Sequence, residues 1–280
     1  MPFASELNKI RFFRLLLYSV AGGGKTTLFR TLPGKKLLII FDPAGICALE
    51  PTDDIEFETF IPKTQNLSVT SNKGASNSPV SYSGSEAYLD YERYMQEKLE
   101  EDYFSKFSWV GFDSITSLQN MILDQIANVH GREGRNPQLE DFSNMAEVLL
   151  KNFRQWTAIN SNVICMAHEK SRQDKLQRTI AMDIMVPGEY SKKLTLLLSD
   201  VYHLYGRRDT ANKAEFLMDV MPTEDYPLAR CSLEIPATVN ITLPNKSCLD
   251  ITKRGFGKIL REKGYYIENK TDTDNETTSS

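Results

Sequence analysis

The chain has little of what marks a membrane protein, a disulfide-bonded protein or a strongly basic nucleic-acid binder. No hydrophobic run in its 280 residues approaches the roughly 18 that a membrane-spanning helix needs. Its 33 Lys and Arg residues are outnumbered by 37 Asp and Glu, so a wholly polybasic surface is excluded and any nucleic-acid site must be a local patch. The four cysteines lie far apart and form no metal-binding pair, which predicts reduced thiols in the cytoplasm.

The most informative segment is a glycine-rich run between an apolar stretch at residues 12–18 and a helix-like stretch at 26–32. This strand–turn–helix context is typical of a phosphate-binding loop, because glycines let successive backbone N–H groups turn toward one anion. The helix start that follows adds partial positive charge. We expect Lys25 to reach the β- and γ-phosphates of ATP or GTP, and Thr26 to coordinate Mg²⁺. The predicted nucleotide-binding residues are Ser19 (where the usual pattern has its first glycine), Ala21, Gly22, Gly23, Gly24, Lys25, Thr26 and Thr27.

Short apolar runs alternate with amphipathic segments along most of the chain. Runs at 37–41, 109–112 and 163–167 predict buried strands, and helical periodicity recurs at 85–103, 118–129, 142–153 and 190–198. The alternation predicts an α/β fold with a mostly parallel central sheet flanked by helices on both faces. We expect one domain at residues 9–262, with a flexible polar insertion at 63–84, and an acidic, disordered tail at 263–280.

Two further strand ends carry polar residues that suit a phosphate site. Asp113 follows the apolar run 109–112, and we expect its carboxylate to emerge beside the strand that precedes the glycine-rich turn, within reach of Mg²⁺. His168 and Glu169 follow the run 163–167, where one or both could sense the γ-phosphate or position the attacking water. Alternatively, the two residues only start the next loop. His130 and His203 have no comparable partners and are expected to be structural or exposed.

Four segments in this order resemble bacteriophage RecA-like nucleotide-binding proteins, some of which are single-strand annealing ATPases. They are residues 18–27, 41–45, 111–118 and 166–169, and the Asp-Ser-Ile-Thr-Ser-Leu stretch that begins at Asp113 also looks like bacterial RecA recombinase. The resemblance covers roughly residues 12–235. It implies a RecA-like P-loop core, ATP with Mg²⁺, a homo-oligomer, action on single-stranded DNA and, for a phage protein, location in the host cytoplasm.

The sequence departs from this family at the catalytic base. The strand after the P-loop helix is expected to end near a glutamate, but Ala44 occupies that place. Glu169, Glu50 and Asp42 are therefore the candidate bases, and slow hydrolysis or a site completed by a neighbouring subunit would fit. The resemblance also implies a basic residue that reaches across a subunit interface. Arg230 is the candidate for that catalytic role, with Arg207 and Arg208 as competitors.

The resemblance places DNA-contacting loops at residues 131–138 and 170–182. Flexible loops with Lys and Arg suit sequence-independent binding of a phosphate backbone, although neither loop contains an aromatic residue for base stacking. The alternative is two solvated polar loops. The candidate DNA-binding residues are Arg132, Arg135, Lys170, Arg172, Lys175 and Arg178.

Three functions compete at this stage. The leading hypothesis is an ATPase that assembles on single-stranded DNA and promotes annealing or strand pairing. The second is a nucleotide-dependent interaction module with little turnover, which recruits replication or recombination proteins, with the acidic tail as a contact. A small-molecule P-loop kinase is disfavoured, because no distinct lid with clustered arginines is evident.

Overall fold

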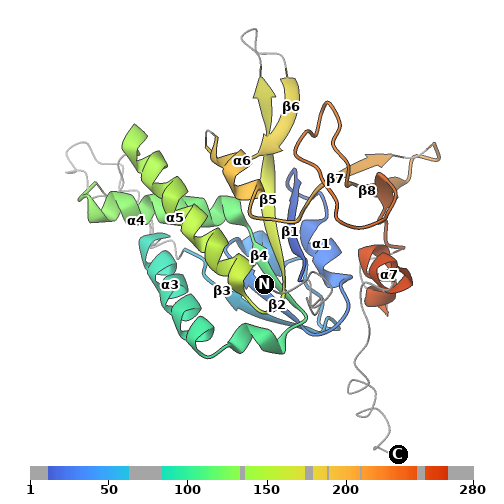
Figure 1. Ribbon diagram of the computed structural model, residues 1–280, viewed down its shortest axis with the longest axis horizontal. Helices are drawn as coiled ribbons and strands as arrows, with labels where there is room; N and C mark the ends of the chain where they lie inside the picture. The colour runs from blue at the N-terminus through green and yellow to red at the C-terminus, as the bar shows by residue number, and fades with distance from the viewer. Residues whose placement is uncertain are drawn as a thin grey trace, which may run out of the picture.

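The computed structural model describes residues 12–62, 84–132, 136–173, 179–187, 189–208, 210–244 and 250–263, which form one nine-stranded sheet with helices on both faces (Figure 1). The strands are β1 (Arg14–Ser19), β2 (Lys36–Ile40), β3 (Ile55–Thr59), β4 (Trp109–Asp113), β5 (Asn162–Gln173), β6 (Thr179–Ile184), β7 (Asp200–Arg208), β8 (Ala214–Asp219) and β9 (Thr238–Asn240). The α-helices are α1 (Lys25–Arg30), α2 (Pro43–Ile46), α3 (Gly84–Glu100), α4 (Ile115–Val129), α5 (Leu139–Ala158), α6 (Tyr190–Thr195) and α7 (Gly255–Glu262).

The sheet order is β3-β2-β4-β5-β1-β7-β8-β9, with β6 paired to β5. All neighbours from β3 to β7 run parallel, and β8 and β9 continue the sheet in antiparallel fashion. The predicted fold class is therefore confirmed. One detail was wrong: β4, which carries Asp113, is not beside β1, because β5 pairs with both and lies between them. The paired strands are far apart in the sequence, so no local sequence pattern indicates their order in the sheet.

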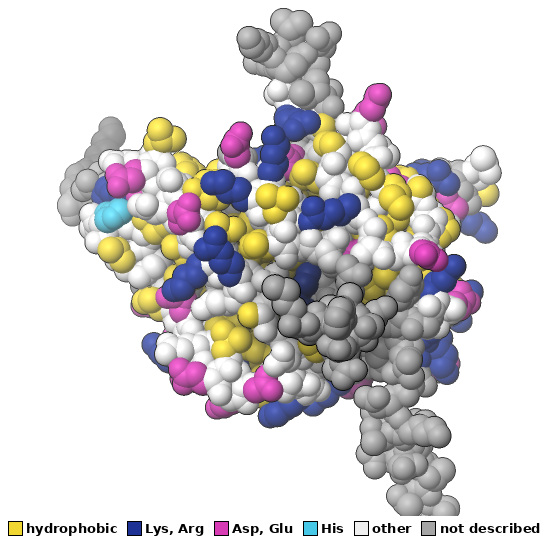
Figure 2. Space-filling model, viewed as in Figure 1, with side chains coloured by type: hydrophobic (Ala, Val, Ile, Leu, Met, Phe, Trp, Pro, Cys, Tyr) yellow, Lys and Arg dark blue, Asp and Glu magenta, His cyan; other side chains and the backbone are white. Residues whose placement is uncertain are grey.

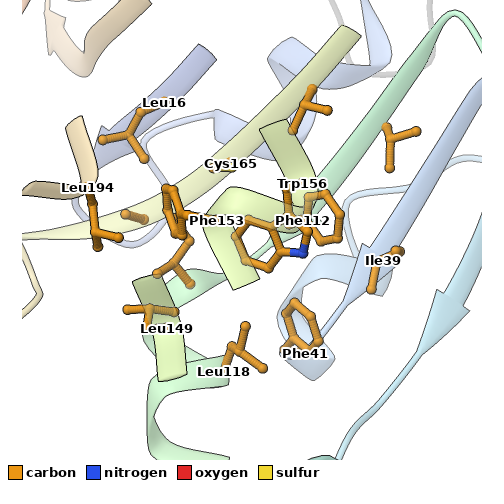
Figure 3. Close-up of a cluster of buried hydrophobic side chains, with 14 of the residues drawn as sticks. Leu16, Ile39, Phe41, Phe112, Leu118, Leu149, Phe153, Trp156, Cys165 and Leu194 are labelled. Carbon is orange, nitrogen blue, oxygen red and sulfur yellow. The ribbon is translucent and has the colours of Figure 1, made fainter. Parts of the chain in front are cut away.

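Each face of the sheet packs against its own set of helices. On β1, Leu16 and Tyr18 face a cluster with residues of α3, α4 and α5, while Leu15 and Leu17 face a second cluster with residues of α1 and α7. In the first cluster, the rings of Phe112 and Trp156 stack with centroids 4.0 Å apart (Figure 3). Because β1 is covered on both faces, its sequence is a continuous apolar run rather than an alternating one.

The segment expected to be a polar loop at 170–182 forms a hairpin instead. β5 continues to Gln173, and β6 returns antiparallel beside it, with Glu169 opposite Ile184. The hairpin projects from the body of the sheet (Figure 1). The extension of β5 is polar and exposed at Ser171, Arg172 and Gln173, so it shows no apolar run of the kind that marks a buried strand. β6 is more apolar and ends at buried Ile184, but its polar surroundings in the sequence gave it no clear boundary.

Several expectations fall outside the described residues. The insertion at 63–84 does so except for Gly84, which begins α3, and the tail at 263–280 does so except for Lys263. Within the described part of the chain, no helix combines the length and hydrophobicity needed to cross a membrane.

Candidate nucleotide-binding site

The turn between β1 and α1 requires glycine at three successive positions for two different reasons. Gly22 and Gly24 have φ angles of 76° and 91°, in the left-handed region that side chains with a Cβ rarely adopt. At Gly23 the constraint is space, since an added Cβ would lie 2.4 Å from Oγ of Ser19. The glycines therefore keep the backbone of the turn open toward the cavity described below.

Lys25 is buried and folds back over this turn. Its ammonium donates to Oγ of Ser19 at 3.0 Å, to the carbonyl of Ser19 at 3.3 Å and to the carbonyl of Val20 at 3.1 Å. Burial lowers the pKa of Lys25, while the nearby carboxylate of Asp113 acts in the opposite direction. Ser19, which departs from the usual glycine, thus supplies a buried hydroxyl that accepts a hydrogen bond from the lysine.

Thr26 and Asp113 form the polar floor of the site. The Thr26 hydroxyl donates to Oδ2 of Asp113 at 2.6 Å. Burial raises the pKa of Asp113, and the hydrogen bond from Thr26 and the charge of Lys25 partly offset that rise. A hydroxyl and a carboxylate are hard oxygen donors of the kind that Mg²⁺ takes together with phosphate oxygens and water. No group of three or more His, Cys, Asp and Glu that could hold a metal occurs among the described residues, so these two residues fit Mg²⁺ only in company with phosphate.

Asp42 is the second carboxylate at the cavity. It caps the N-terminus of α2 by accepting from the backbone N–H of Ala44 at 2.9 Å, and it also accepts from Oγ of Ser117 at 3.4 Å. Ala44 lines the cavity beside it, at the place where the resemblance implies a glutamate. Glu50 does not line the cavity. Of the candidate bases, Asp42 is the one that does.

His168 and Glu169 point to opposite faces of β5, as neighbours on a strand do. His168 lines the cavity and its backbone N–H donates to the Thr116 hydroxyl at 3.1 Å; burial lowers its pKa, and the charge of Lys25 lowers it further. Glu169 does not line the cavity, and its Oε2 is hydrogen-bonded to Nε2 of buried His203 at 2.7 Å. His203 is thus structural, as expected, although it does have a carboxylate partner.

The cavity over the P-loop has a volume of about 450 Å³, and its lining contains a polar group and an apolar group of residues, which we call its polar and apolar ends. Its polar end is lined by the glycine-rich turn, Lys25, Thr26, Asp42, Asp113 and His168. Its other end is apolar and was missed by the sequence reasoning, because its residues come from β8, the segment after β9, and α7, and meet only in the folded chain. The apolar end is lined by Phe216, Ile241, Leu243 and Phe256.

The predicted interface arginine is bound within its own chain. Arg230 donates through Nη2 to the backbone carbonyls of Thr195 and Leu198, at the end of α6. Its competitors are exposed: Arg207 pairs with Glu215 at 2.9 Å and Arg208 donates to Asn212 at 2.8 Å. The structure therefore shows Arg230 fixing the end of α6. The sequence did not predict this contact, because Arg230 and α6 are far apart in the chain.

The predicted DNA-binding arginines and lysines differ in whether they are bonded within the protein or exposed. Arg132 donates two hydrogen bonds, of 2.7 and 2.6 Å, to the buried carboxylate of Asp141, and this pairing lowers the pKa of Asp141 to about 2. Lys170 donates to the carbonyl of Val186, whereas Arg172 is exposed on β5. Arg135, Lys175 and Arg178 lie outside the described residues.

His130 is exposed, as expected, and it contacts Arg132 and Asp141. On the face drawn in Figure 2, Lys and Arg side chains are interspersed with acidic and hydrophobic ones rather than gathered in one basic patch.

Comparison with known proteins shows the family of the chain. A family model described as "AAA domain" matches residues 11–225, which span the chain from just before β1 to just beyond β8 and stop before β9 and α7. Among solved structures, a KaiC-like protein from the hyperthermophilic archaeon Pyrococcus horikoshii OT3 is similar over 73% of this chain and 76% of its own, with 12% sequence identity and a TM-score of 0.35. No curated protein matches.

Proposed function

The chain belongs to the AAA domain family, and we propose that it is a RecA-like ATPase that binds ATP with Mg²⁺ and acts on single-stranded DNA. The observation that carries the nucleotide part is the hydrogen bond between Thr26 and Asp113 beside buried Lys25. Lys25 and Thr26 begin α1 directly after the glycine turn, and Asp113 ends β4. Together they supply the cation, the hydroxyl and the carboxylate that binding a nucleoside triphosphate requires.

The residues of the turn have separate tasks in binding. Backbone N–H groups from Gly22 to Lys25 bind phosphate oxygens, and the ammonium of Lys25 exchanges its carbonyl partners on Ser19 and Val20 for phosphate oxygens. Thr26 and Asp113 would hold Mg²⁺, which neutralises charge on the phosphates when bound. His168 lines the same cavity and is the proposed contact for the terminal phosphate.

Hydrolysis is proposed to be slow in the isolated chain. Among the described residues that line the cavity there are two carboxylates: Asp113, which is bonded to Thr26, and Asp42, which is bonded to Ala44 and Ser117. Asp42 is the proposed group for orienting the attacking water, but both its oxygens already accept hydrogen bonds, which weakens it as a base. A neighbouring subunit in a homo-oligomer, or DNA, would then accelerate turnover.

The β5–β6 hairpin is the proposed contact for single-stranded DNA. It carries exposed Arg172, and Lys175 and Arg178 belong to the segment that connects its two strands. His168 at the cavity lies four residues before Arg172 on the same strand, so a change at the phosphate site has a direct covalent route to the hairpin. The resemblance to phage RecA-like proteins supports a role in recombination, annealing or replication.

A second candidate is an interaction module that binds nucleotide with little turnover and recruits replication or recombination proteins. Two observations favour it: Ala44 stands where the resemblance implies a glutamate, and Arg230 is bound to carbonyls of its own chain. In this alternative the nucleotide changes the shape of the protein, and the acidic tail is one surface for partners.

Steady-state ATP hydrolysis with and without single-stranded DNA, at low salt, separates the two candidates. Lys25→Ala serves as the control for contaminating activity. Stimulation of turnover by DNA supports the DNA-dependent ATPase, whereas ATP binding with unchanged, slow turnover supports the interaction module. Hydrolysis that persists in Lys25→Ala would contradict the site assignment.

A further inference from the structure

We infer that the apolar end of the cavity is the nucleobase site, and that the part of the chain after residue 225 builds most of it. This inference rests on the proposed nucleotide binding and adds the position and character of the base site. Ile241, Leu243 and Phe256 all lie beyond the segment that the family model covers, and Phe216 lies near its end.

The cavity follows α1 from Thr26 to Thr31, over a length that suits a nucleotide. Thr26 lies at the polar end, and Thr31, the C-cap of α1, also lines the cavity. Five residues of helix cover about 7.5 Å, which leaves room for a ribose between phosphates at the first residue and a base near the second. At about 450 Å³ the cavity is within the usual size range of small-molecule sites.

Phe216 is held directly beside the P-loop. A Cβ added to Gly24 would lie 3.5 Å from Cδ1 of Phe216, in ordinary van der Waals contact. The backbone of Phe216 is fixed in turn, because its carbonyl accepts from Ile241 N–H at 2.9 Å and its N–H donates to the Thr242 hydroxyl at 2.8 Å. The aromatic ring and the aliphatic side chain of Ile241 therefore form one preorganised wall.

The opposite part of the wall depends on close docking of α7 against the end of α1. A Cβ on Gly257 would lie only 1.8 Å from the carbonyl oxygen of Thr31, and one on Gly255 would lie 3.1 Å from Cγ2 of the same residue. The two glycines bring the backbone of α7 against α1 and place Phe256, which lies between them, in the cavity wall. The ring of Phe256 also packs edge-on against Tyr202, with centroids 5.8 Å apart.

We expect this wall to bind a nucleobase with little selectivity among the bases. The side chains of Phe216, Ile241, Leu243 and Phe256 have no hydrogen-bonding groups, and the Thr31 hydroxyl already donates to the carbonyl of Leu28 at 2.7 Å. Apolar walls discriminate weakly between similar ligands, whereas strong discrimination needs polar groups that would be left unpaired with the wrong ligand. Adenine and guanine nucleotides should therefore bind with similar affinity.

Calorimetric titration with Mg²⁺ present compares ATP, GTP and inorganic tripolyphosphate, which has the phosphates but no base. In Phe216→Ala, ATP should bind about tenfold more weakly, the scale of losing one aromatic contact to a base, with tripolyphosphate affinity unchanged. Unchanged tripolyphosphate binding also shows that the variant is folded. Phe57→Ala, which removes a half-exposed ring from β3, away from the cavity, is the matched control and should change neither affinity.

The outcomes separate the base site from the proposed function. ATP affinity that is unchanged in Phe216→Ala, while Lys25→Ala loses both ligands, would overturn the base site and leave the P-loop intact. Equal weakening of ATP and tripolyphosphate would also overturn it, because the ring would then act on the phosphate end. A preference of more than about 100-fold for one purine would overturn the apolar, base-tolerant character. A wild-type protein that binds none of the three ligands would contradict the proposed function itself.

Discussion

The hydroxyl of Thr26 and the carboxylate of Asp113 are joined by a 2.6 Å hydrogen bond, although the residues lie 87 positions apart in the chain. The bond links the first turn of α1 to the end of β4, a strand that does not touch β1. β5 lies between the two strands, so Asp113 reaches Thr26 across the edge of a neighbouring strand. The pair proposed to hold Mg²⁺ is therefore assembled by the order of the strands as much as by either motif.

Lys25→Ala is expected to weaken ATP binding by about 10- to 100-fold, the scale of losing charge-assisted hydrogen bonds, while leaving the fold intact. Lys36→Ala is the matched control. Lys36 is also a buried lysine that donates to backbone carbonyls, those of Leu32 at 3.0 Å and Gly34 at 3.1 Å, but it lies outside the cavity. It should lower thermal stability and leave ATP affinity unchanged. Equal loss of affinity in both variants, measured by calorimetry, would show that the effect is general destabilisation.

Asp113→Asn is expected to abolish the effect of Mg²⁺ on ATP binding without lowering the stability of the ligand-free protein at neutral pH. Burial raises the pKa of Asp113, so its ionised form costs folding stability, and that cost appears as the pH rises through the raised pKa. Asparagine keeps an acceptor for Thr26 and removes the buried charge. Thermal unfolding tests the expected stability, and ATP titrations in Mg²⁺ and in EDTA test the expected loss of the Mg²⁺ effect. A large drop in melting temperature would contradict the assigned cause of the pKa shift.

Gly23→Ala should destabilise the P-loop by about 1–3 kcal/mol, because its Cβ would meet Ser19 Oγ and Cβ at 2.4 and 2.7 Å. Adding Ser19→Gly removes both of these atoms and should restore much of the stability, which a double-mutant cycle in urea measures. Gly22→Ala is the contrasting control: nothing lies within 4 Å of its added Cβ, but its φ is +76°. Ser19→Gly should not rescue that variant. Rescue of both would mean that Ser19 acts on the whole turn rather than on one contact.

The Arg132–Asp141 pair should make the protein sensitive to acid. Pairing lowers the pKa of Asp141 from 3.8 to about 2, so its contribution to stability is present above about pH 4 and is lost as the pH falls toward 2. Arg132→Gln should be less stable at neutral pH and should depend less on pH in that window, as measured by urea unfolding. Arg93→Gln, which breaks an exposed pair with Asp90, should change neither quantity. Parallel pH profiles for wild type and Arg132→Gln would refute this assignment.

If the β5–β6 hairpin binds single-stranded DNA, Arg172→Ala should weaken binding and reduce the slope of log affinity against log salt by about 0.7 for one lost phosphate contact. Arg132→Ala should leave the slope unchanged, because the guanidinium of Arg132 already donates two hydrogen bonds to Asp141 within the protein. Fluorescence anisotropy with a labelled oligonucleotide at several salt concentrations gives both slopes. A change for Arg132 and none for Arg172 would move the DNA contact to the other loop.

The sequence was informative where the chemistry is local. The P-loop can be recognised because nine consecutive residues carry its constraints, and Asp113 because a buried strand ends in a carboxylate. It was uninformative where residues meet only through the fold. The residues next to Arg132 and Glu169 in the sequence do not show that Asp141 and His203 will pair with them. Arg132 was therefore assigned to DNA binding and Glu169 to catalysis. The apolar end of the cavity was missed for the same reason, since Phe216 and Phe256 lie 40 positions apart on separate elements.

The cavity also has a consequence for the order in which the protein is made. The glycine-rich turn at its polar end begins near residue 20, whereas Phe256 in its apolar wall is synthesised much later. Domains begin to fold from the N-terminal side during synthesis, so the sheet can begin to form while the apolar side of the cavity is still open. A ligand that needs both ends could stabilise the protein only after Phe256 has been synthesised, so a shorter ribosome-bound intermediate would have to fold without the ligand.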